Sequence, residues 1–208
     1  MESQPPVSAQ PSWFGYFQAA ALTALCPLLV KSTSLLSALI ISAAFAFTLC
    51  ASSVCVSLSR RLIAPHSEVA CILLIAAVWA TVADLFLQAT LFPMRDGLGI
   101  YLPLMACNSL LLVQLEEVAL LEGPVAALRG SGSVAWRAGL LIIASGAIRE
   151  LAATGQWLSD APLVGWQAHF GALITVKLPL LASGAGAFIV LSFLTAAANR
   201  MWPERRVD

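Results

Sequence analysis

The stretch Leu25-Cys-Pro-Leu-Leu-Val30 decides how this sequence is interpreted. It places a thiol directly before a proline, inside an apolar run that begins at Phe14. Proline removes a backbone N–H donor and clashes with the preceding helical turn. In hydrocarbon, such an interruption is tolerated only where protein covers it or where it lines a cavity. If the chain lies in a membrane, Cys26 is therefore a candidate site residue at a broken helix.

The composition is that of a membrane protein. Of the 208 residues, 60% are hydrophobic and 11% are charged, whereas soluble domains carry about 25% charged residues. The formal net charge is zero, which gives no indication of a nucleic-acid-binding surface. We therefore expect an all-α integral membrane protein that is embedded in the lipid bilayer and has no nucleic acid partner.

Six apolar segments fill most of the chain. A membrane-spanning helix needs about 20 apolar residues, and each segment is close to or above that length. We expect a polar leader over 1–13, a six-helix membrane domain over 14–199 and a basic cytoplasmic tail over 200–208. The six expected spans are 14–31, 36–58, 69–93, 98–121, 134–154 and 171–199.

The basic residues predict an orientation. With six spans, both termini and the second and fourth connections share one side, which would hold seven of the eleven Lys and Arg residues. Basic residues accumulate on the cytoplasmic side, so we expect a multi-pass protein of the bacterial inner membrane with both termini in the cytoplasm. The seven residues are Arg60, Arg61, Arg129, Arg137, Arg200, Arg205 and Arg206.

The chain is expected to consist of two inverted three-helix repeats, about 14–93 and 98–199, each with a broken first helix. The run Cys26-Pro-Leu-Leu-Val30 resembles Ser109-Leu-Leu-Leu-Val113 in the first helix of the second half. Since each half has three spans, the halves would run in opposite directions. Inverted repeats place binding sites near the bilayer midplane, at discontinuous helices.

A second proline and a second thiol, Pro103 and Cys107, come just before the second of these runs. At 1.5 Å per residue, Cys26 and Cys107 would both lie near the midplane. Iron–sulfur clusters use four thiolates, so this chain would supply two and a partner protein the others. The alternative is that cysteine serves only as a small packing residue, which is how we interpret Cys50, Cys55 and Cys71.

Asp84, Arg149 and Glu150 are charged residues in or at the ends of the expected spans. Asp84 lies deep in the third segment, where a lone carboxylate is costly unless it is paired, protonated or hydrated. It is either a step in ion or proton passage or a protonated packing residue. Arg149 and Glu150 close the fifth segment and are expected to be an anchor pair at the membrane interface.

These residues resemble the E subunit of the Rnf (Rsx) electron-transport complexes. The resemblance covers about residues 15–200 and extends more distantly to the D and E subunits of the sodium-pumping NADH:quinone reductase. It implies a six-helix protein paired with a paralogue, the A subunit, with two cysteines from each of the two holding one intramembrane [2Fe–2S] cluster. The similar positions are Leu25–Leu29, Lys31–Thr33, Leu98–Leu104 running to Asn108, Glu116, Gly123–Pro124 and Arg149–Glu150.

The resemblance assigns Cys26 as one cluster ligand and leaves the second position open. The family pattern is Asn-Cys, whereas this chain has Asn108-Ser109, with Cys107 two residues before the serine. On a regular helix, two residues rotate a side chain by about 200°, to the opposite face. Either Cys107 takes the role, or Ser109 is a poor oxygen substitute, or the cluster is altered. We predict Cys26 and Cys107 as the metal ligands.

The sequence thus predicts a membrane subunit of an Rnf-type ion-translocating ferredoxin:NAD oxidoreductase, which relays electrons through a [2Fe–2S] cluster shared with the paralogous A subunit. The other expected partners are the B, C, D and G subunits. No nucleotide or flavin motif is present, so a complete active site is not expected in this chain alone. The alternatives are a small inverted-repeat secondary transporter and a scaffold protein without a cluster.

Overall fold

The computed structural model describes residues 26–63, 65–154 and 183–201, and the regular secondary structure of this part of the chain is all helical, without a strand. Four of its segments are long and apolar enough to cross a membrane. The elements are α2 (Cys26–Lys31), α3 (Leu35–Ser59), η2 (Pro65–Ser67), α4 (Glu68–Thr90), α5 (Phe92–Leu98), η3 (Gly99–Tyr101), η4 (Pro103–Cys107), α6 (Ser109–Gln114), η5 (Leu115–Ala119, a π-helical turn), α7 (Pro124–Thr154) and α9 (Gly184–Met201).

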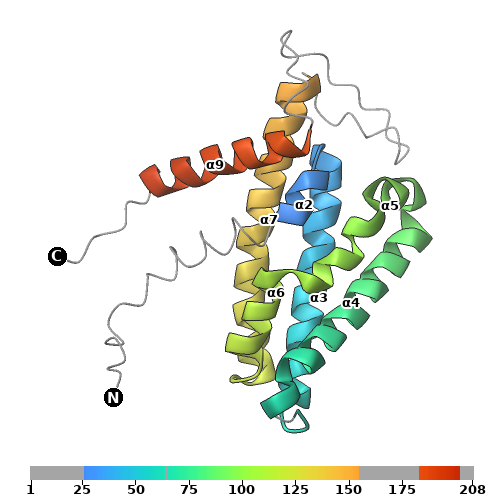
Figure 1. The fold of residues 1–208 in the computed structure, drawn as a ribbon, viewed down its shortest axis with the longest axis vertical. Helices are drawn as coiled ribbons and strands as arrows, with labels where there is room; N and C mark the ends of the chain where they lie inside the picture. Colours follow the sequence, from blue (N-terminus) through green and yellow to red (C-terminus); the bar gives the residue numbers. More distant parts are fainter. Residues whose placement is uncertain (1–25, 64, 155–182, 202–208) are drawn as a thin grey trace, which may run out of the picture.

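Helices α3 and α7 form the centre of the bundle, and they lie side by side over most of their length (Figure 1). Ser34 caps α3 by accepting a hydrogen bond from the backbone N–H of Ser37 at 3.2 Å. Small residues let the two backbones approach closely, as is common between membrane helices. A Cβ atom added to Gly146 of α7 would lie 2.5 Å from the Cβ atom of Ala38, and Ser53 and Ser131 share a short hydrogen bond.

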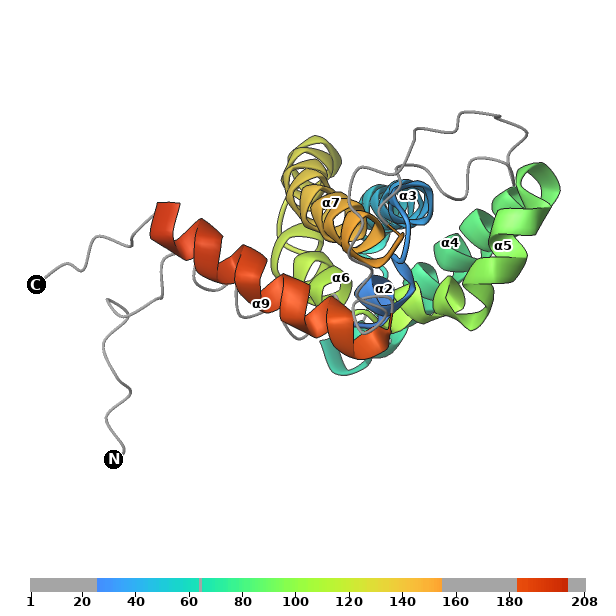
Figure 2. The same cartoon turned by 90° about the horizontal axis from the view of Figure 1, so that it is seen from above.

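The chain crosses the bundle several times in alternating directions. The α3–α4 connection and the turn before α7 lie at one end, because Arg60 Nη1 donates to the carbonyls of Leu121 and Glu122 at 3.1 and 2.9 Å. The α2–α3 turn and α5 lie at the other end (Figure 1). Viewed along the bundle, α2 and α6 lie on one side of α3 and α7, and α9 crosses that same side (Figure 2).

The expected spans are confirmed in part. The segment 36–58 is α3 almost residue for residue, and 69–93 is α4 followed by the start of α5. The prediction for the fifth span is wrong at its start, because α7 begins at Pro124 and not at 134. Arg129, which the sequence placed in the fourth connection, therefore lies on α7, as does Arg137.

The fourth expected span, 98–121, is interrupted, as the sequence predicts. It consists of η3, η4, α6 and η5 in succession instead of one continuous helix. Of the first and sixth spans only the ends are described, as α2 and α9, and the rest of 14–31 and of 171–199 lies outside the described residues, as do the leader and most of the tail.

Candidate functional site

The interruption of the fourth apolar segment lies at Asn108, between η4 and α6. Asn108 has an extended backbone (φ −71°, ψ 122°), and its side chain accepts a hydrogen bond from the backbone N–H of Leu110 at 2.9 Å. The residue is buried, with 2% of its surface exposed. Asparagine is one of the preferred N-cap residues of helices. The capping hydrogen bond of Asn108 therefore stabilises the break in the backbone.

Cys107 and Ser109 flank this break, and both are exposed on the surface of the chain. On a regular helix two residues would turn a side chain by about 200°. The extended backbone of Asn108 interrupts the helix between Cys107 and Ser109, so this rule does not separate them. Exposure alone therefore does not distinguish the two residues, although a thiolate is a far softer metal ligand than a hydroxyl.

Cys26, the other predicted ligand, is the first residue of α2. Its side chain lies outside the described residues, so the structure does not test whether it meets Cys107. The two leucines that follow, Leu28 and Leu29, are buried at 0% and 1% exposure. The helix that carries Cys26 is thus packed firmly into the bundle.

The remaining described cysteines differ from Cys107 in exposure. Cys50, Cys55 and Cys71 are half-buried, and Cys55 Sγ accepts a hydrogen bond from Trp79 Nε1 at 3.2 Å, between α3 and α4. Among the residues whose side chains the structure describes, no three His, Cys, Asp or Glu side chains gather in a way that could hold a metal ion. A metal at Cys107 would therefore need ligands from elsewhere in the chain or from a second protein.

Arg149 and Glu150 are buried, and the prediction of an interfacial anchor pair is wrong. Their exposures are 0% and 1%. Arg149 Nη1 donates to the carbonyls of Leu29 and Ser32 at 2.6 and 3.0 Å, and Glu150 Oε2 accepts from the backbone N–H of Leu35 at 2.9 Å. Ionisable residues inside a membrane segment are functional candidates by default, but a pair at the end of an apolar segment fits an interfacial position equally well from the sequence alone.

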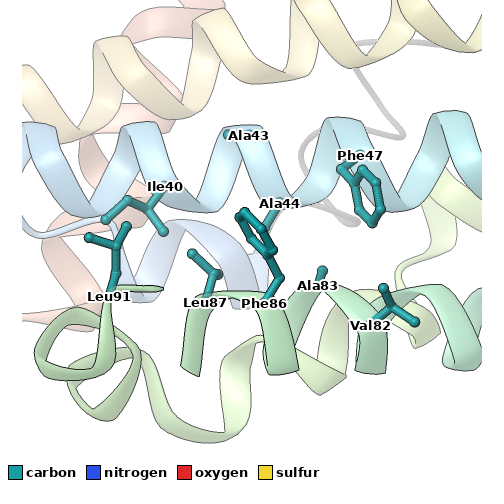
Figure 3. Close-up of a pocket in the computed structure, with 9 residues that line it drawn as sticks. All are labelled: Ile40, Ala43, Ala44, Phe47, Val82, Ala83, Phe86, Leu87 and Leu91. Carbon is teal, nitrogen blue, oxygen red and sulfur yellow. The ribbon is translucent and has the colours of Figure 1, made fainter. Parts of the chain in front are cut away.

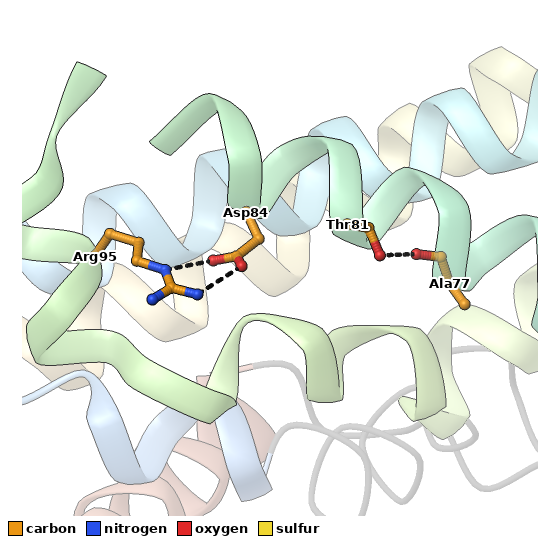
Figure 4. A network of polar contacts seen from close by, with 4 residues as sticks. All are labelled: Ala77, Thr81, Asp84 and Arg95. Atoms are coloured by element: carbon orange, nitrogen blue, oxygen red, sulfur yellow. Dashed lines mark hydrogen bonds and ion pairs between the residues drawn. The ribbon is translucent and has the colours of Figure 1, made fainter. Parts of the chain in front are cut away.

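Asp84 is not a lone carboxylate. It forms a bidentate ion pair with Arg95 of α5, with Nε to Oδ1 at 2.9 Å and Nη2 to Oδ2 at 2.8 Å (Figure 4). A guanidinium matches a carboxylate in this geometry, which adds specificity to the attraction. The pair fixes the position of α5 against the last turns of α4, so the structure gives Asp84 a partner that neither interpretation of the sequence foresaw.

We expect Asp84→Asn and Arg95→Gln each to lower the thermal midpoint of the protein in detergent by a few degrees. The thermal midpoint of the double variant should be no lower than that of the less stable single variant, because the two side chains act as one pair. Additive losses would contradict this coupling.

An apolar cavity of about 460 Å³ lies between α3 and α4 (Figure 3), and Cys107 is not among the residues that line it. Its lining contains no charged side chain, so it offers no ligand for a metal and no acid or base. The aromatic residues Phe47 and Phe86 are both largely exposed. The lining residues are Ile40, Ala43, Ala44, Phe47, Val82, Ala83, Phe86, Leu87 and Leu91.

Comparison with known proteins identifies the family. A family model described as an Rnf-Nqr subunit, membrane protein, matches residues 9–195. The E subunit of an ion-translocating oxidoreductase complex from Thioalkalivibrio sulfidiphilus is 31% identical over 200 residues, which is 93% of this chain and 87% of the relative. The corresponding E subunits of Cellvibrio japonicus (29% identity; 93% of this chain and 84% of the relative) and Pseudomonas aeruginosa strain LESB58 (30%; 86% and 78%) are similar.

These matches confirm the resemblance on which the sequence interpretation rested. They cover the described helices α2 to α7 and most of α9, and the relatives are matched over most of their own length. The chain belongs to the Rnf-Nqr family of membrane-protein subunits.

Proposed function

We propose that this chain is the E-type membrane component of an ion-translocating ferredoxin:NAD oxidoreductase complex. In this proposal it shares an intramembrane [2Fe–2S] cluster with its paralogue, the A-type component, and the cluster relays single electrons across the bilayer. Electron transfer is coupled to ion translocation by the complex, whose other partners are the B, C, D and G subunits. The chain contributes ligands and a scaffold, while donor and acceptor bind elsewhere in the complex.

The observation that carries the proposal is the exposed thiol of Cys107 beside the break in the fourth apolar segment. Iron–sulfur clusters are held by thiolates, and Cys107 is the exposed one among the four cysteines whose side chains are described. Asn108 holds the break open as a helix cap, which leaves the thiol next to it at the surface for a second protein. The donor set therefore fits a cluster that two proteins complete, with Cys26 as the second ligand from this chain.

The proposed arrangement in the membrane has six helices in two inverted repeats, 14–93 and 98–199, in the bacterial inner membrane with both termini in the cytoplasm. Four membrane-capable helical segments support it, as do the connections at alternating ends of the bundle. The proposal places Cys26, the first residue of α2, near the bilayer midplane. Arg60 and Arg61, at the end of α3, would mark the cytoplasmic side.

The proposal is tested on the purified complex by iron analysis and by the visible and electron paramagnetic resonance spectra of a [2Fe–2S] cluster. Cys26→Ala is expected to abolish both the cluster iron and the spectrum, because a cluster loses stability without one of its thiolates. Cys71→Ala, which removes a half-buried thiol on α4, is the matched control and should retain both.

Two other outcomes point to the alternatives. A fully assembled wild-type complex without cluster iron would contradict the proposal and leave a scaffold protein. Transport by the isolated, iron-free chain in vesicles would instead favour a secondary transporter built from inverted repeats.

A further inference from the structure

We infer that Arg149 is a positioning residue that holds α2, and with it Cys26, in place for the shared cluster. This inference rests on the proposed function, because Cys26 has a role to be positioned for only if a cluster is bound. It assigns a task to a buried cation that the sequence interpretation had placed at the membrane interface.

The first step of the argument is the C-terminal end of α2. The last carbonyls of a helix have no partner within the helix, and a carbonyl that is buried without a hydrogen-bond partner is costly. Arg149 Nη1 donates to the carbonyls of Leu29 and Ser32 at 2.6 and 3.0 Å and lies 3.4 Å from that of Val30. A guanidinium offers five donors, and its positive charge suits the negative end of a helix. Arg149 thus caps α2 from another helix.

The second step is that the same guanidinium joins α2 to a third helix. Arg149 Nη2 donates to the carbonyl of Ser183, the residue before α9, at 3.0 Å. The neighbouring residue, Glu150, accepts from the backbone N–H of Leu35 at the start of α3. Two consecutive residues of α7 therefore contact both sides of the turn between α2 and α3. Arg149 places a positive charge at the end of α2, and Glu150 places a negative charge at the start of α3. Figure 2 shows α2 enclosed by α7, α3 and α9.

The third step connects Cys26 to the clamp, by which we mean the hydrogen bonds from Arg149 to the carbonyls at the end of α2. The cysteine lies three residues before Leu29 on α2, which is about 4.5 Å along the helix axis at 1.5 Å per residue. A helix of six residues is far too short to be stable by itself. The position of its first residue therefore depends on how its last turn is held, and Arg149 is the described side chain that holds this turn from α7.

The test uses the purified complex with Arg149→Gln, Arg149→Lys and a control, Arg129→Gln. Arg129 lies on the same helix but is exposed. Amide hydrogen exchange of residues 28–34 is expected to become about tenfold faster or more in Arg149→Gln, because hydrogen bonds to a charged donor are lost. Lysine should restore part of the protection, since it keeps the charge but loses the forked geometry. Arg129→Gln should not change the exchange.

A second readout separates positioning from simple structural support. In Arg149→Gln the electron paramagnetic resonance g values and the midpoint potential of the cluster should shift, while Arg129→Gln keeps the wild-type values. If exchange becomes faster but the cluster signals do not change, the positioning role is overturned. Unchanged exchange overturns the clamp itself.

The two proposals fail in different ways. A wild-type complex without cluster iron refutes the proposed function, and the positioning role with it, before any variant is made. If Arg149→Gln does not assemble, Arg149→Lys is used for the test. Wild-type hydrogen exchange together with wild-type g values and midpoint potential would overturn the inference. Faster exchange together with shifted g values and a shifted potential would support it.

Discussion

Replacing Cys107 with alanine in the assembled complex is expected to remove the cluster iron and the [2Fe–2S] spectrum, whereas Ser109→Ala should leave both intact. Both side chains are exposed at the same helix break, so the difference between them is chemical. A cysteine ionises to a thiolate, the ligand that iron–sulfur clusters use, while a serine hydroxyl stays protonated at neutral pH. Iron per complex and the reduced spectrum are the measurements.

A further variant tests whether the shifted cysteine replaces the family ligand. Cys107→Ala combined with Ser109→Cys restores the Asn-Cys order of the family and should recover the cluster, provided that the extended backbone at Asn108 lets either neighbour reach it. Loss of iron in Ser109→Ala alone would instead make the serine the ligand. Full iron in both alanine variants would show that the second ligand lies at another position.

The helices with continuous apolar sequence could be predicted from the sequence, whereas the first ten residues of α7, 124–133, could not. The limits of α3 follow from its apolar run and from Ser34 at its start. By contrast, residues 124–133 have the composition of a connection because they contain glycine, serine and arginine. In the structure they begin α7, where Ser131 bonds to Ser53 of α3. Hydropathy reports the cost of leaving water, and it does not report how closely small residues let two helices pack.

In the candidate site, too, some features could be predicted from the sequence and others could not. The break at Cys107 and Asn108 was predictable, because a proline, a thiol and a helix-capping residue follow one another within an apolar segment. The burial of Arg149 was not predictable, because its acceptors near Leu29 are about 120 positions away in the chain. A charged pair at the end of an apolar segment has the same local appearance whether it faces the membrane interface or caps a distant helix.

The second large effect that we expect is a loss of stability when a side chain is added where α3 and α7 approach closely. Gly146→Ala should lower the free energy of unfolding by about 1–3 kcal/mol, the usual cost of overpacking. The new Cβ atom would lie 2.5 Å from the Cβ atom of Ala38 and 3.1 Å from the backbone oxygen of Ser34. Since neither atom is the end of a flexible side chain, the two helices must separate. Chemical unfolding of the purified chain in detergent is the measurement.

The control is Gly132→Ala, on the same helix and two heptads earlier, where an added Cβ atom meets nothing within 4 Å. Alanine is favoured over glycine in a helix by about 1 kcal/mol, so this variant should be neutral or more stable. Ala38→Gly together with Gly146→Ala should recover part of the lost stability, because it removes the closer of the two contacts and leaves the contact with Ser34. If Gly146→Ala were as stable as Gly132→Ala, α3 and α7 would have to be packed less closely at Gly146 than the structure shows. Arg149 and Glu150 lie one turn further along α7. Looser packing there would move them away from the ends of α2 and α3 that they cap.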